Sequence, residues 1–115
     1  MSYYAIDFGT SNSLLSYIKD DGSILPVPLE KDGGLVLRSL LYTSENNVWH
    51  FGKDAIKEYI NTDGEGRFFR SVKKFLPETS YSGTVVFNKT MNISEIIAVF
   101  MAEMRRRANI YKRQC

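Results

Sequence analysis

Residues 4–13 of this chain combine side chains and backbone in a pattern suited to binding charged groups. Asp7 ends a short apolar run, and Gly9 follows it closely, with the small polar residues 10–13 behind. A glycine lets the backbone approach a ligand, and successive N–H groups in a turn can hold an anion. The carboxylate of Asp7 beside them could meet a cation. Together these features match the chemistry of phosphate groups and their magnesium ion.

The same residues have a second interpretation. An ordinary β-hairpin whose turn is rich in small polar residues would show this spacing, because such residues are common in turns. The motif is not a Walker loop, since no Gly-Lys-Ser or Gly-Lys-Thr follows. It is not a dinucleotide fingerprint either, since the apolar run 14–18 predicts a strand instead of a helix. Spacing alone leaves both interpretations open.

Length and composition indicate one globular domain or part of a larger one. The chain has 115 residues, 43% of them hydrophobic, and a formal net charge of +2. This small charge gives no reason to expect binding to nucleic acid or to a membrane surface. No segment approaches the roughly 20 apolar residues that a membrane-spanning helix needs. The single cysteine, Cys115, cannot form an internal disulfide, so we expect a cytoplasmic protein.

The hydrophobic pattern predicts a mixed α/β chain. Strands are expected over 2–8, 13–19, 24–29, 35–43, 48–51 and around 84–87. A helix is expected over 53–60, and the basic and aromatic stretch 67–76 is expected to be helical in part. The clearest element is the last, because apolar residues from Ile93 to Ala108 follow helical spacing. Asn92 and Glu95 predict a capping pair at its start.

The motif Ile-Asp-Phe-Gly-Thr-Ser-Asn-Ser at 6–13 resembles the first phosphate motif of the actin-like ATPase superfamily. Later features resemble, in the same order, the DnaK-type heat-shock chaperones (the heat shock protein 70 kDa family). These are a hairpin over 39–51 before a helix, a lysine segment over 67–76, and the long final helix. The resemblance implies a ribonuclease H-like, actin-like α/β lobe with an N-terminal β-meander and a small α/β insertion.

The resemblance also implies site residues for a bound Mg-ATP. Asp7 would contact the magnesium ion through water, since Mg²⁺ gives up its waters reluctantly. The phosphate-binding residues would be Gly9, Thr10, Ser11 and Asn12. Lys73 would join Asp7 as a catalytic residue by approaching the γ-phosphate, with Lys74 as the second choice. From the residues alone, a Lys-Lys pair after a hydrophobic run is more often a solvated surface.

On this resemblance the chain divides into three parts. Residues 1–34 would form the phosphate-binding hairpin region, 35–91 an insertion subdomain, and 92–115 the helix that returns to the first lobe. The match covers only the opening part of the family's two-lobed domain. We therefore expect an N-terminal fragment of an ATP-hydrolysing protein, inactive alone and prone to self-association. The family implies client proteins and co-chaperones as partners of the whole protein.

Two departures from the family predict a divergent branch. Arg38 stands where the family often has proline, and Pro77 stands where glycine is common. Two alternative functions remain open. A sugar kinase or cell-shape ATPase of the same superfamily would share the phosphate motif but not explain the Lys73 segment.

The other alternative is a protein-interaction module that keeps the hairpins without binding nucleotide. Large aromatic side chains often dominate binding surfaces, and this chain offers Trp49, Phe51, Phe68 and Phe69 for such a surface.

Overall fold

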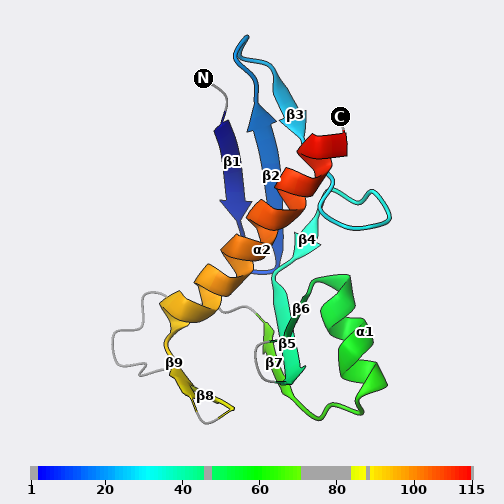
Figure 1. The fold of residues 1–115 in the computed structure, drawn as a ribbon, viewed down its shortest axis with the longest axis vertical. Helices are drawn as coiled ribbons and strands as arrows, with labels where there is room; N and C mark the ends of the chain where they lie inside the picture. The colour runs from blue at the N-terminus through cyan, green and yellow to red at the C-terminus, as the bar shows by residue number, and fades with distance from the viewer. Residues whose placement is uncertain (1–2, 46–47, 71–83, 88, 115) are drawn as a thin grey trace.

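The computed structural model describes residues 3–45, 48–70, 84–87 and 89–114. Its elements are β1 (Tyr3–Phe8), β2 (Asn12–Ile18), β3 (Ile24–Pro26), β4 (Leu37–Arg38), β5 (Leu40–Glu45), β6 (Val48–Phe51), α1 (Lys53–Asn61), β7 (Arg67–Arg70), β8 (Thr84–Val86), β9 (Lys89–Met91) and α2 (Ile93–Gln114). Figure 1 shows the long helix α2 lying across the sheet that holds β1 and β2. The chain is thus mixed α/β, with antiparallel strand pairs throughout the described part.

The first sheet is a meander in the order β1-β2-β3, with β4 also paired to β2. β1 and β2 pair antiparallel along their whole length. The turn from β2 to β3 contains Gly22 at a φ of 86°, a conformation that glycine adopts without strain. Pro26 ends β3 after three residues, which agrees with the preference of proline for sheet edges.

The second sheet has the order β6-β5-β7. The sequence pattern predicts one strand over 35–43, but the chain bends at Ser39 and divides it between two sheets. Before the bend β4 pairs with β2, and after it β5 pairs with β6 and β7. Helix α1 packs against β5 and β6.

The basic and aromatic stretch 67–76 begins as a strand. Its first four residues form β7, in which Arg67 lies opposite Thr43 and Arg70 lies opposite Leu40. Backbone pairing with β5 therefore overrides the helical expectation over these residues. The remainder of the stretch, including Lys73 and Lys74, lies outside the described residues.

Helix α2 covers one face of the first sheet and supplies much of the core. Its fully buried stripe consists of Ile96, Phe100, Met104 and Ala108, which confirms the spacing seen in the sequence. At its start the side chain of Asn92 accepts the N–H of Glu95 at 2.8 Å, and Glu95 Oε1 accepts the N–H of Asn92 at 3.4 Å. This reciprocal cap confirms the predicted pair. Among the described helices, none is long and apolar enough to cross a membrane.

Candidate functional site

The turn between β1 and β2 is tight, with Thr10 and Ser11 at its tip. The N–H of Gly9 donates to the carbonyl oxygen of Asn12 at 2.9 Å. A Cβ atom at position 9 would lie 2.5 Å from that same oxygen, closer than side-chain atoms can approach. Position 9 therefore requires glycine because the two arms of the turn are so close together.

Ser39 holds this turn from the bend between β4 and β5. Its N–H donates to the carbonyl oxygen of Ser11 at 2.9 Å, and its hydroxyl donates to the carbonyl oxygen of Gly9 at 3.1 Å. The same hydroxyl lies 2.9 Å from that of Ser13, and both serines are buried. Two contacts thus fix the turn backbone before any ligand arrives, and the third ties Ser39 to Ser13 of β2. No local sequence signal indicates this role of Ser39, because it depends on β4 lying beside β2.

Asp7 and Asn12 lie on the face of the sheet that points away from α2. Phe8 stacks on Phe100 of α2 with ring centroids 5.7 Å apart, and neighbouring strand residues point to opposite faces. Asp7 is therefore directed away from the helix. Asn12 follows the same rule, since the next residue, Ser13, is fully buried. Both are exposed, and we call this surface the open face.

Two backbone N–H groups of the turn are available as hydrogen-bond donors. In the described structure, the backbone N–H groups of Thr10 and Ser11 donate to no protein acceptor. Asp7 forms no ion pair with any described residue. Free N–H groups in a turn favour an anion, and a free carboxylate nearby favours a cation.

The residues also suit a magnesium ion that arrives with a phosphate. No three His, Cys, Asp or Glu side chains of the described residues gather as a metal-ligand set. Asp7 is thus a single carboxylate rather than part of a protein cage. Mg²⁺ typically keeps several waters and binds one or two carboxylates together with substrate phosphates. A hydrated Mg-phosphate group fits this arrangement.

The predicted site residues are only partly placed. The structure brings together Asp7 and residues 9–12 at one end of the first sheet. Lys73 and the second choice, Lys74, lie outside the described residues.

The aromatic residues suggested for an interaction surface lie on β6 and β7 and are partly or fully buried. Phe51 is buried in the core, and Trp49 packs on Phe69 with ring centroids 6.0 Å apart. Phe68 packs against Tyr42 and Tyr59. Trp49 and Phe69 meet because β6 and β7 lie on either side of β5.

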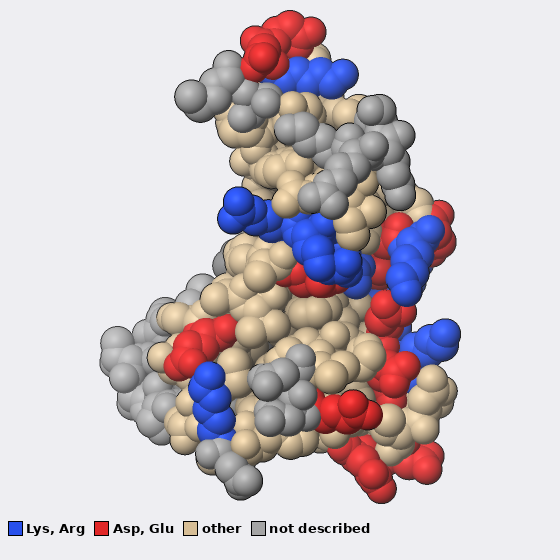
Figure 2. Space-filling view, in the orientation of Figure 1, with Lys and Arg blue, Asp and Glu red and all other residues tan. Residues whose placement is uncertain are grey.

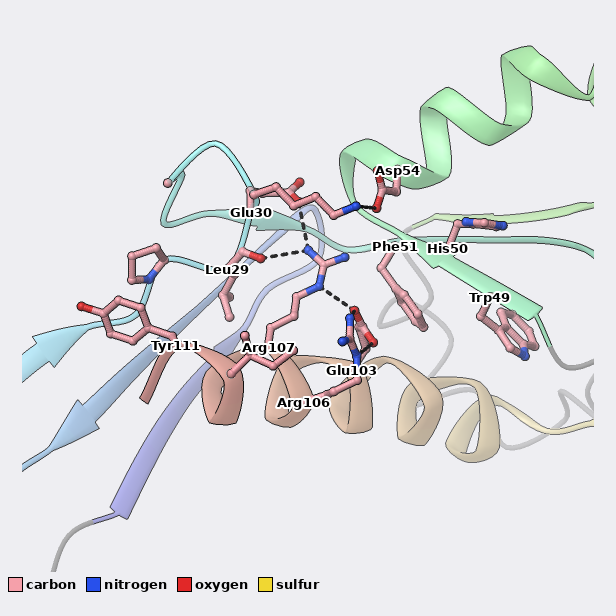
Figure 3. Close-up of a pocket in the computed structure, with 14 residues that line it drawn as sticks. Leu29, Glu30, Trp49, His50, Phe51, Asp54, Glu103, Arg106, Arg107 and Tyr111 are labelled. Carbon is pink, nitrogen blue, oxygen red and sulfur yellow. Dashed lines mark hydrogen bonds and ion pairs between the residues drawn. The ribbon is translucent and has the colours of Figure 1, made fainter. Parts of the chain in front are cut away.

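A groove of about 760 Å³ lies between α2, β6 and the loop after β3. Arg107 extends along it toward Leu29, Glu30 and Glu103 (Figure 3). Its guanidinium donates to Glu30 Oε1 and to the Leu29 carbonyl oxygen at 2.9 Å each, and to Glu103 Oε2 at 2.6 Å. Figure 2 shows a basic band across the middle of this face with acidic side chains beside it. The groove is therefore lined by charges that already neutralise one another.

Glu30 also caps helix α1. Gly52, at the start of the helix, has a φ of 59° and no side chain to accept the first N–H groups. Glu30 Oε2 accepts the N–H of Lys53 at 3.0 Å instead. A carboxylate at a helix N-terminus also interacts favourably with the helix dipole. One buried carboxylate thus connects α1 to Arg107 of α2.

The ionisation of Glu103 is coupled to its two arginine partners. Burial by itself would raise the pKa of Glu103, but hydrogen bonds from Arg106 and Arg107 outweigh it and lower the pKa below its ordinary value. The bond to Glu103 raises the pKa of Arg106. Folding therefore favours the charged form of Glu103.

Of the two sites, the turn offers free donors and the groove offers groups already satisfied. The turn is thus the stronger candidate for binding a ligand. A scan against protein-family models and a search of curated proteins each find no match to this chain. The case for a ligand site at the turn therefore rests on the turn's own residues and contacts.

Replacing Ser39 by alanine should destabilise the fold by about 1–3 kcal/mol, because the buried Ser13 hydroxyl loses its partner. Urea denaturation measures this loss. The double variant Ser13→Ala/Ser39→Ala removes both hydroxyls and should cost less than the sum of the two single changes. Strictly additive costs would contradict the contact between the two serines.

Replacing Arg107 by alanine should cost about 3–5 kcal/mol of unfolding free energy, because Glu30 stays buried without its cation while Glu103 keeps only Arg106. The matched control is Lys31→Ala, since Lys31 pairs with Asp54 at 3.7 Å and its side chain is 89% exposed. That surface change should cost less than about 1 kcal/mol. Similar losses for the two variants would show that the buried pair has no special role.

Acid should weaken the fold partly through Glu103. Its folded pKa lies below the ordinary value of 4.5. Folding therefore favours the carboxylate, and the resulting stability is present above pH 4.5 and lost as the pH falls through the folded pKa. The stability difference between wild type and Glu103→Gln, measured by urea denaturation, should shrink as the pH falls below that value. A constant difference across the acid range would refute the coupling.

Proposed function

We propose that this chain is the opening part of an ATP-binding, ATP-hydrolysing domain with a ribonuclease H-like, actin-like fold, nearest to the DnaK-type chaperones. The order of its elements supports the proposal: a phosphate-type hairpin first, then a second hairpin with a helix, and finally a long helix. The likeness at residues 6–13 and 67–76 supports it independently of the geometry.

The observation that carries the proposal is the fixed turn at residues 9–12. Ser39 holds its backbone, the N–H groups of Thr10 and Ser11 remain available, and Asp7 lies free on the same face of the sheet. A preorganised set of donors stabilises an anion without having to rearrange when the anion binds. This support comes from Ser39, which lies just after β4.

The residues would share the work as follows. The turn N–H groups and the Asn12 amide would hold phosphate oxygens. Asp7 would position the waters of the magnesium ion, which neutralises phosphate charge when it is bound. Lys73 would approach the γ-phosphate and offset the charge that develops during transfer. Chaperone clients and co-chaperones would be partners of the whole protein.

The protein encoded by the whole natural gene should bind Mg-ATP in calorimetric titration and hydrolyse it. Lys73→Ala should lower the hydrolysis rate about a hundredfold or more, because it removes charge stabilisation from the transition state. The control Lys57→Ala removes an exposed lysine from α1 and should leave the rate nearly unchanged.

Absence of binding heat at millimolar Mg-ATP would instead favour an interaction module. A further check is the reading frame downstream of residue 115. A second phosphate motif of the type Asp-Xaa-Gly-Gly-Gly-Thr there would support the proposal, and a continuing frame without one would overturn it.

A further inference from the structure

The strand beside the turn carries an arginine that the proposed function does not use. We infer that Arg38 and the free N–H groups of Thr10 and Ser11 form one binding site for the phosphate oxygens of a polyphosphate chain. The inference rests on the proposed function, because it concerns the same turn. It adds a cationic side chain from β4 to a site otherwise made of backbone and Asn12.

The strand register places Arg38 beside the turn. β2 and β4 pair antiparallel, with Asn12 directly opposite Arg38 and Ser13 opposite Leu37. Ser13 and Leu37 are fully buried, so their neighbours Asn12 and Arg38 point to the open face. Directly opposite residues of an antiparallel pair have Cβ atoms about 5 Å apart. The Cβ atom of Arg38 therefore lies at the edge of the predicted phosphate site.

The backbone at Arg38 is fixed to the turn itself. The next residue, Ser39, donates its N–H to Ser11 and its hydroxyl to Gly9. The position of Arg38 relative to the free N–H groups is thus set by the same contacts that shape the turn. Only the side chain has to order when an anion binds, which lowers the entropic cost of binding.

The guanidinium of Arg38 is available for a ligand. It is exposed, and it has no ion-pair partner in the part of the chain that the structure describes. Arg106 and Arg107 differ in this respect, because Glu103 accepts hydrogen bonds from both. An arginine fork matches phosphate geometry and binds it through two parallel charged hydrogen bonds.

Asp7 gives the open face a negative charge that is separate from the positive charge of Arg38. It lies on β1 while Arg38 lies on β4, with β2 between them, and the structure forms no ion pair between the two side chains. Without a cation, the carboxylate repels a phosphate. With Mg²⁺ beside it, this repulsion becomes attraction. The arrangement therefore predicts anion binding that strengthens with magnesium.

The test uses tripolyphosphate as the probe, titrated calorimetrically into the protein of the whole natural gene with and without Mg²⁺. Arg38→Gln should weaken binding about tenfold to a hundredfold, as expected for the loss of hydrogen bonds from a charged donor. Arg38→Lys should recover part of the affinity, because the charge remains but the fork is lost. The control Arg105→Gln removes an exposed charge from α2 and should change nothing. Unchanged thermal unfolding of each variant confirms that the fold is intact.

The outcomes separate this inference from the proposed function. Equal affinities of wild type and Arg38→Gln, with Mg-ATP still bound, would overturn the inference and leave the proposed function standing. Binding of tripolyphosphate that depends on Arg38, without binding of Mg-ATP, would support the inference and overturn the nucleotide function. Failure of the wild type to bind either probe would overturn both.

Discussion

The buried ion pair between Glu30 and Arg107 is the contact on which the arrangement of the other elements depends. Glu30 Oε1 accepts Arg107 at 2.9 Å, while Oε2 accepts the first N–H of α1 at 3.0 Å. The side chains of Glu30 and Arg107 are only 5% and 10% exposed, respectively. A charge at such depth is costly unless it is paired, so this carboxylate requires both helices in place. It joins the loop after β3, α1 and α2 at one point.

Ser39 connects separate parts of the backbone, as Glu30 connects the two helices. The chain passes there from the sheet under α2 to the sheet under α1, and a bend of this kind leaves polar groups unpaired unless something satisfies them. The N–H and hydroxyl of Ser39 do so by contacting the β1–β2 turn. The same bonds that accommodate the bend therefore also shape the candidate phosphate site.

The two faces of the first sheet have different roles as a result. The face toward α2 is filled by the apolar stripe of the helix, which supplies stability. The open face holds the exposed Asp7, Asn12 and Arg38 beside exposed apolar side chains such as Leu14. A carboxylate or guanidinium can bind a ligand only where it is not already paired within the fold. Because α2 covers one face of the sheet, the other face is left available for binding.

The sequence by itself determined the features that depend on near neighbours. Helical spacing predicted the buried stripe of α2, the pair Asn92 and Glu95 predicted its cap, and the small residues at 9–12 predicted a tight turn. Local spacing suffices for these, because the interacting groups lie within a few residues of one another.

Only the tertiary structure decided which distant residues meet. Arg107 contacts Glu30 across 77 positions, Ser39 contacts Gly9 across 30, and backbone pairing with β5 made residues 67–70 a strand. The pattern also gave no sign that residues 35–43 would divide at Ser39, or that Arg38 would point to the open face. Both depend on strand register, which is set by packing between segments that the local pattern does not relate.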